Sequence, residues 1–145
     1  MAVPLRGYSR AVARRLGFAL LVVLVAAGCG VRNSKPFTAK ASAPCFAKAG
    51  FISVSTNPSK VGFIAGFADN GGVRATSATG NVLTIAFTAG PDSVASTEEA
   101  FTSHAPPSLR PRISDIMSSN RNAVLVWTVT PKADEADAAT RCLKG

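Results

Sequence analysis

The sequence predicts an α+β domain whose centre runs strand, helix, strand, strand, helix, strand, with a further helix at each end. Polar and apolar residues alternate over 51–56 and 82–88, which is typical of half-buried strands. Apolar residues recur at helical spacing over 59–68, and turn-forming residues separate the segments. This order of elements is that of the ferredoxin-like βαββαβ antiparallel sheet, so we expect that topology with additional N- and C-terminal helices.

Turn residues mark the ends of the individual elements. In the first half we expect a helix capped by Ser42 and ended by Gly50, a strand over 51–56, a helix over 59–68 that stops at Asn70-Gly71-Gly72, and a hairpin of strands over 73–77 and 82–88 that turns at Gly80-Asn81. In the second half we expect a helix from 92 or 93 to about 103 that ends before Pro106-Pro107, a helical turn or short strand within 109–121, a strand over 123–130, and a helix after Thr130-Pro131.

The strand over 123–130 is apolar on both of its faces. Leu125 and Trp127 point to one side, and Val124 and Val126 point to the other. A strand of this kind needs cover on both sides. We therefore expect the internal helices on one face of the sheet and the two terminal helices on the other.

The N-terminal segment has the pattern of a secretion signal. Residues 1–15 carry four arginines and no acidic residue, and an apolar stretch follows over 16–27. The stretch is shorter than the roughly 20 apolar residues that a membrane-spanning helix needs. The pattern predicts a cleaved signal peptide over 1–28.

The end of this segment, Ala26-Ala27-Gly28-Cys29, resembles the lipobox of bacterial lipoproteins, with Ala26 where those proteins usually carry leucine. The resemblance implies a diacylglyceryl or palmitate-type lipid on Cys29 and anchoring to the cell membrane on its extracytoplasmic side. The alternative is cleavage by an ordinary signal peptidase, which leaves Cys29 as a free thiol.

The segment over 29–42 is polar and contains a proline, which predicts a flexible tether ahead of a single domain over 43–145. The net charge of +8 is concentrated at the N-terminal end of the chain. Removing the signal lowers it to +4, and three of the remaining cations lie in the tether, at Arg32, Lys35 and Lys40. The domain lacks the clustered basic patch of a nucleic-acid-binding protein, so no nucleic-acid partner is expected.

Cys45 and Cys142 fall on the two terminal helices that the pattern predicts. Exported proteins meet an oxidising compartment in which cysteines pair. If Cys29 carries the lipid, two cysteines remain, and we expect them to form a disulfide that closes about 100 residues of chain.

Four segments of the domain resemble a family of small exported proteins from high-GC Gram-positive bacteria. They are Cys45–Gly50, Val82–Phe87, Asn122–Trp127 and the closing Cys142-Leu143. The resemblance implies a compact domain in which Cys45 and Cys142 are paired. It implies no activity.

The residue types that carry catalysis or bind metals do not form a recognisable motif. His104 is the single histidine, and its place before Pro106 predicts a solvent-exposed residue. Glu98 and Glu99 are adjacent on a helix and therefore diverge. Gly71-Gly72 lacks the lysine of a phosphate-binding loop, and Trp127 is expected in the core. We expect no catalytic residue, cofactor or metal site.

These observations favour a lipid-anchored, non-enzymatic domain that binds a ligand or protein of the cell envelope. Two alternatives remain open at this point. One is a small hydrolase-like envelope enzyme, which would bring His104 close to a serine and a carboxylate in a pocket. The other is a passive structural lipoprotein without a large apolar surface patch. The sequence leaves the oligomeric state open.

Overall fold

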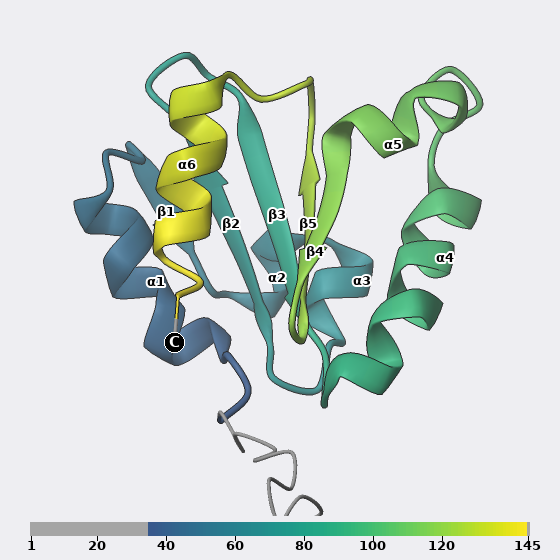
Figure 1. Cartoon of the computed structure of the whole chain (residues 1–145), viewed down its shortest axis with the longest axis horizontal. Helices are drawn as coiled ribbons and strands as arrows, with labels where there is room; N and C mark the ends of the chain where they lie inside the picture. Colours follow the sequence, from purple (N-terminus) through teal and green to yellow (C-terminus); the bar gives the residue numbers. More distant parts are fainter. Residues whose placement is uncertain (1–34, 145) are drawn as a thin grey trace, which may run out of the picture. The chain divides into compact units, whose positions relative to one another are not determined.

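The structure, a computed structural model, describes residues 35–144 as a five-stranded antiparallel sheet with helices on both faces (Figure 1). The helices are α1 (Ala39–Lys48), α2 (Pro58–Val61), α3 (Phe63–Gly66), α4 (Val94–His104), α5 (Ile113–Ile116) and α6 (Ala133–Arg141), with 3₁₀ turns η2 (Pro91–Ser93) and η3 (Arg110–Arg112). The strands are β1 (Ser53–Ser55), β2 (Gly72–Thr76), β3 (Val82–Phe87), β4 (Met117–Asn120) and β5 (Ala123–Trp127).

The predicted α+β class is confirmed, but the strand order differs from the ferredoxin-like order. The sheet runs β1-β2-β3-β5-β4. In split βαβ units another strand lies between the two strands that a helix connects, whereas here β1 pairs directly with β2 in antiparallel fashion. The reason is the connection between β1 and β2. Its helices α2 and α3 are single turns, so the chain re-enters the sheet at the end where β1 left it.

The expected single helix over 59–68 is broken at Gly62. This residue has φ of +93°, a conformation that glycine adopts readily, and it ends α2 and precedes α3. Close approaches occur at two nearby glycines. A Cβ at Gly66 would lie 2.7 Å from the carbonyl oxygen of Pro58, and a Cβ at Gly72 would lie 2.5 Å from the carbonyl oxygen of Ala65 in α3.

The segment over 109–121, which the sequence left undecided, contains both of the structures considered for it. It forms η3 and α5 and then continues into β4, which pairs with β5 at the edge of the sheet. The hairpin of β2 and β3 is confirmed, with Arg74 opposite Thr84 in its register.

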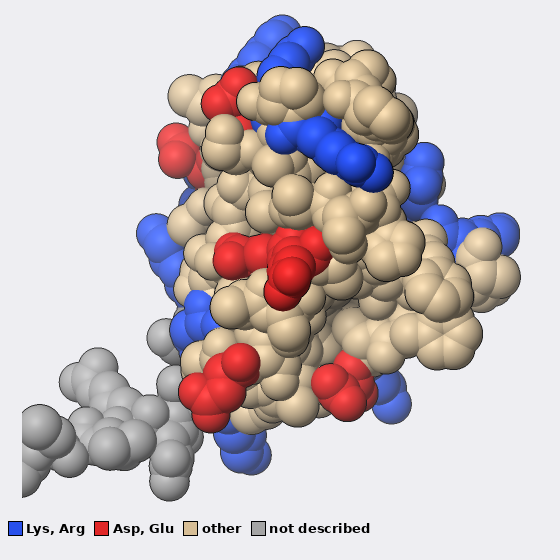
Figure 2. All heavy atoms as spheres, turned by 90° about the vertical axis from the view of Figure 1, so that its right-hand side faces the viewer, with Lys and Arg blue, Asp and Glu red and all other residues tan. Residues whose placement is uncertain are grey.

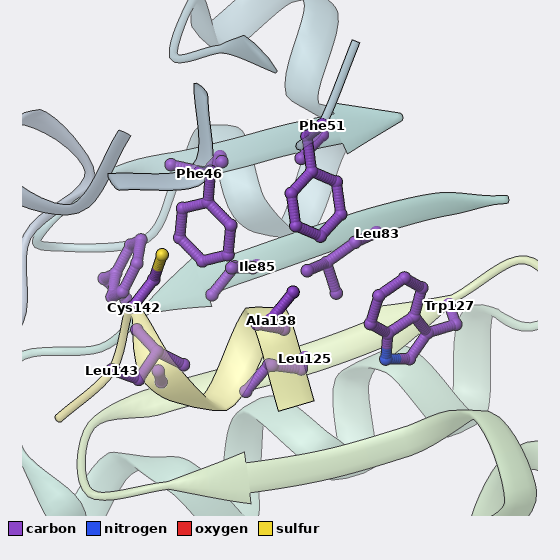
Figure 3. Packing of buried hydrophobic residues seen from close by; sticks show 14 of the residues in the cluster. Phe46, Phe51, Leu83, Ile85, Leu125, Trp127, Ala138, Cys142 and Leu143 are labelled. Carbon is purple, nitrogen blue, oxygen red and sulfur yellow. The ribbon is translucent and has the colours of Figure 1, made fainter. Parts of the chain in front are cut away.

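One face of the sheet is covered by α1 and α6, and we call it the disulfide face. Its strands contribute Val73, Ala75, Leu83, Ile85 and Leu125, which form one buried cluster with residues of both helices. Figure 3 shows the aromatic rings of this cluster packed above the sheet. Phe46 lies edge-on to Phe51 at a centroid distance of 5.6 Å, and Phe51 stacks on Trp127 at 6.3 Å.

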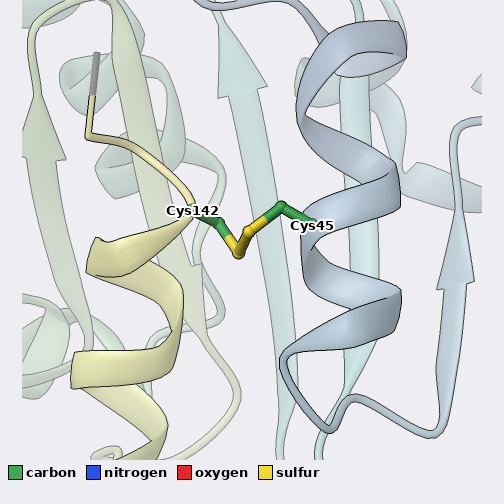
Figure 4. Close-up of a disulfide and its surroundings, with 2 residues drawn as sticks. All are labelled: Cys45 and Cys142. Atoms are coloured by element: carbon green, nitrogen blue, oxygen red, sulfur yellow. A yellow bond between two sulfur atoms is a disulfide. The ribbon is translucent and has the colours of Figure 1, made fainter.

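The predicted disulfide is present and joins the two helices of this face (Figure 4). The Cα atoms of Cys45 and Cys142 lie 5.5 Å apart, and the residues are 97 positions apart in the chain. A loop of this length corresponds to about 4.7 kcal/mol in the chain-entropy description of cross-links. The terminal helices therefore cover the face expected for them, and a covalent bond holds them there.

The domain begins earlier than the sequence predicted. We expected residues 39–42 to close the flexible tether, but they form the first turn of α1, whose N-cap is Thr38 rather than Ser42. Phe37 is also fixed, because the buried Asn122 side chain accepts a hydrogen bond from its N–H and donates one to its carbonyl, at 2.8 and 2.9 Å. The Arg121 guanidinium lies 4.2 Å from the Phe37 ring centroid.

Candidate ligand-binding groove

The second face of the sheet is only partly covered, and we call it the groove face. Here α2 contacts β2, α3 contacts β3, and α4 contacts β5. A small core of Val61, Ala65 and Ala86, flanked by Phe101, fixes α3 and α4 against the sheet. Between these helices lies a groove of about 320 Å³, which is at the lower end of the range for small-molecule sites.

The floor of the groove is one transverse row of the sheet. Arg74 on β2 pairs with Thr84 on β3, and Thr84 pairs with Val126 on β5. Side chains at paired positions of neighbouring strands project from the same face, so these three lie side by side and all line the groove. The alternation of Leu83 and Ile85 around Thr84 places the polar residue here and the apolar ones in the opposite core.

The walls of the groove are apolar. One wall consists of Val61, Phe63 and Ile64 of α2 and α3. The other wall consists of apolar residues from the C-terminal half of α4 to α5. In this second wall the chain changes direction at Pro106-Pro107, just after the end of α4. The Arg110 side chain holds this turn by donating hydrogen bonds to the carbonyls of Ala105 and Ser103, at 2.9 and 3.1 Å.

Phe63 continues the apolar wall out to the surface. It is 74 % exposed, and its ring centroid lies 5.0 Å from that of Phe67, which is 80 % exposed. Buried positions usually hold residues of this size. Both rings follow the break at Gly62, and both lie at the surface.

The groove lining contains two ionisable side chains, one arginine and one histidine. Arg74 lies in the floor and His104 at the end of α4, and no acidic residue is among the described residues that line the groove. Figure 2 shows this side of the molecule with acidic groups near its middle and lower end and the largest group of basic side chains near its top. Glu98 and Glu99 are the carboxylates of α4.

His104 is exposed, as predicted, and its contacts are with its own helix. Its Nδ1 lies 2.9 Å from the Ala100 carbonyl oxygen and 3.2 Å from Ser103 Oγ. An N–H at Nδ1 that donates to the carbonyl leaves no free lone pair there to accept the serine proton. Ser103 does not line the groove. The two residues are therefore not arranged as a nucleophile and its base toward a ligand in the groove.

Trp127 connects the two faces of the sheet. It is only 4 % exposed and stacks on Phe51 within the disulfide-face core, as predicted, yet part of it lines the groove. It is the single tryptophan of the chain. Its fluorescence can therefore report on occupancy of the groove.

A buried carboxylate lies at the other end of the sheet, beside a smaller hollow of about 110 Å³. Glu135 accepts hydrogen bonds from Thr79 Oγ1, from the N–H of Lys132 and from Asn81 Nδ2, at 2.7, 2.9 and 3.3 Å. Burial alone raises its pKa, but hydrogen bonds from Ser77, Thr79, Lys132 and Asn81 outweigh that effect and lower the pKa from 4.5 to about 2. Because its oxygens are already occupied, Glu135 fixes the start of α6 to the β2–β3 turn.

The other positions that the sequence singled out are the lipidation site Cys29 and the pair Gly71-Gly72. Cys29, the predicted lipidation site, lies outside the described residues, as does the signal segment. Gly71-Gly72 ends the α3 region and opens β2, and Gly71 has φ of +79°. Among residues 35–144, no group of histidine, cysteine and acidic side chains could hold a metal ion, and no helix there is long and apolar enough to cross a membrane.

Sequence reasoning missed the groove itself. Local signals for parts of it were present, because Arg74 and Thr84 are polar positions in otherwise apolar strands and the hairpin register sets them opposite each other. The walls depend on how α3 and α4 are placed on the sheet, for which no short-range signal exists. No family model, curated protein or solved structure matches the chain.

Proposed function

We propose that this protein is a non-enzymatic binding domain held at the extracytoplasmic side of the cell membrane by a lipid on Cys29. The groove between α3 and α4 is its binding site. The observation that supports binding is the apolar lining of this groove, which continues to an exposed phenylalanine instead of closing into a core. Ligand sites have this composition, with few polar groups among apolar walls.

The anchor is supported by the sequence pattern over 1–29, by the four-residue resemblance to a lipobox and by the disulfide, which fits an oxidising compartment. Five residues lie between Cys29 and Lys35, where the described domain begins. Even a fully extended segment of this length spans only about 20 Å. The groove is thus proposed to work close to the bilayer surface, on ligands that reside in or near it.

Native mass spectrometry of protein purified from its own membranes tests both parts of the proposal. The wild type is expected to carry a covalent diacylglyceryl adduct, which Cys29→Ser abolishes, together with non-covalently bound small molecules. Thr84→Phe places a strand-compatible ring on the groove floor and should displace those molecules while the adduct stays.

The matched control is Thr76→Phe, which lies on the same sheet face but outside the groove lining. It should keep both the adduct and the bound molecules. An unmodified wild type in the soluble fraction would contradict the anchor. Equal occupancy of the wild type and Thr84→Phe would contradict the assignment of the groove as the binding site.

A further inference from the structure

The floor of the groove presents a cation and a hydroxyl that other described residues leave free. Neither the Arg74 guanidinium nor the Thr84 hydroxyl has a hydrogen-bond partner among the side chains and backbone groups of residues 35–144, and Arg74 forms no ion pair there. Thr128, the next hydroxyl of this lining, is already committed, because it donates to Asn81 Oδ1 and accepts from the N–H of Val82. The polar contacts available to a ligand are therefore concentrated at Arg74 and Thr84.

These two groups are placed to act on a single ligand head. Arg74 and Thr84 are cross-strand partners, which sets their Cβ atoms about 5 Å apart. A guanidinium presents its N–H groups as a planar fork that matches the two oxygens of a carboxylate, and a threonine hydroxyl donates one further hydrogen bond. No acidic side chain of the described lining competes for this position.

The rest of the groove suits an alkyl chain. From Val126 on the floor, the lining runs to Ile64 on one side and to Phe101, Leu109 and Ile113 on the other. The only further ionisable side chain among these described lining residues is His104 at the rim. A volume of about 320 Å³ accommodates a single small ligand and not a folded partner. Each methylene that leaves water for such a lining raises affinity roughly fourfold.

We infer that the groove binds a single-chain amphiphile with a carboxylate head, which Arg74 pairs and Thr84 hydrogen-bonds while the alkyl chain lies between α3 and α4. This inference rests on the proposed function and adds the chemical class of the ligand. Charge complementarity selects the head group, and the apolar walls select the chain.

The experiment titrates the mature Cys29→Ser chain, residues 29–145, with three dodecyl probes below their micelle concentrations: dodecanoate, dodecanol and dodecyltrimethylammonium. Trp127 fluorescence reports binding from within the groove. Dodecanoate should bind saturably, at least about tenfold more tightly than dodecanol, since a hydrogen bond to a charged group is worth that factor or more. The cationic probe should bind most weakly.

Variants at three positions separate recognition of the head group from binding of the alkyl chain. Arg74→Gln should weaken dodecanoate at least about tenfold and leave dodecanol unchanged, and Arg74→Lys should restore part of the loss. Thr84→Phe should remove binding of both probes. Lys60→Gln, which removes an exposed cation outside the groove lining, should change nothing.

The outcomes distinguish this inference from the proposed function. If dodecanoate and dodecanol bind equally, and Arg74→Gln affects neither while Thr84→Phe removes both, the carboxylate assignment is wrong and the groove remains a binding site. If no probe binds the wild type, both fail. Sedimentation of the same samples adds one more result: a dimer that Thr84→Phe dissociates would make a second copy of the chain the occupant and would overturn the inference.

Discussion

Replacing Cys45 and Cys142 together with alanine should lower the free energy of unfolding by about 3–5 kcal/mol, the largest effect of any change considered for this domain. The disulfide closes a loop between residues 97 positions apart, so its loss frees almost the whole described chain in the unfolded state. It also releases α1 and α6, which are short and present many alanines to the core. Urea denaturation followed by Trp127 fluorescence measures the change.

Reduction provides the matched control for this variant. Dithiothreitol should destabilise the Cys29→Ser chain by about the same amount and should leave the Cys29→Ser/Cys45→Ala/Cys142→Ala chain unchanged. Because the bond lies on the disulfide face, the alkyl probes should still bind to the folded fraction of the triple variant. Equal unfolding midpoints with and without the bond would show that the terminal helices hold the sheet without it.

Lowering the pH should unfold the protein, and the protonation of Glu135 should help to set the pH range of unfolding. Its pKa is about 2 in the folded state, against 4.5 for an unperturbed glutamate. A lowered folded pKa means that the ionised form stabilises the fold, so its contribution is complete above about pH 5 and is lost as the pH falls from 5 toward 2. The difference corresponds to roughly 3 kcal/mol, which urea denaturation at a series of pH values measures.

Glu135→Gln keeps the shape of the side chain and removes the charge. Its amide N–H₂ would face the donors of Thr79, Asn81 and Lys132, so the variant should lose about 2–3 kcal/mol at pH 7 and show a flatter stability curve between pH 5 and 2. Asp137→Asn, an exposed acid on the same helix, should cost no more than about 0.5 kcal/mol. Parallel curves for the wild type and Glu135→Gln would contradict the role given to this network.

Much of the fold could be predicted because its signals are local. Strands β2, β3 and β5 carry clear alternation or a long apolar run, and glycine, asparagine and proline mark most of the ends. The pairing of Cys45 with Cys142 followed from counting cysteines in a chain that we expect to be exported. The disulfide face, whose core depends on these elements, was therefore correctly assigned to the two terminal helices.

The differences arise where long-range contacts override local pattern. The helix expected over 59–68 had adequate periodicity, but the chain turns at Gly62, and α3 packs closely against Gly72. The tether was expected to reach residue 42 because its composition is polar, but the distant Asn122 and Arg121 hold Phe37 in place. A contact across 85 residues leaves no mark on the local sequence.

The groove could not be predicted from the sequence for the same reason. Its floor follows from the hairpin register, but its walls come from α2, α3, α4 and α5, and their spacing over the sheet is a property of the assembled fold. Phe63 illustrates the difference, since a phenylalanine is expected inside and this one lies at the surface. Only the structure reveals this exposed Phe63 ring, which supports the proposed binding function.

The most direct test of this account is a crystal structure of the secreted Cys29→Ser chain with 12-bromododecanoate, in which the anomalous signal locates the bromine. The account predicts bromine against the apolar walls between α3 and α4, with the carboxylate at Arg74. A groove filled by its own side chains, or bromine bound only elsewhere, would contradict it.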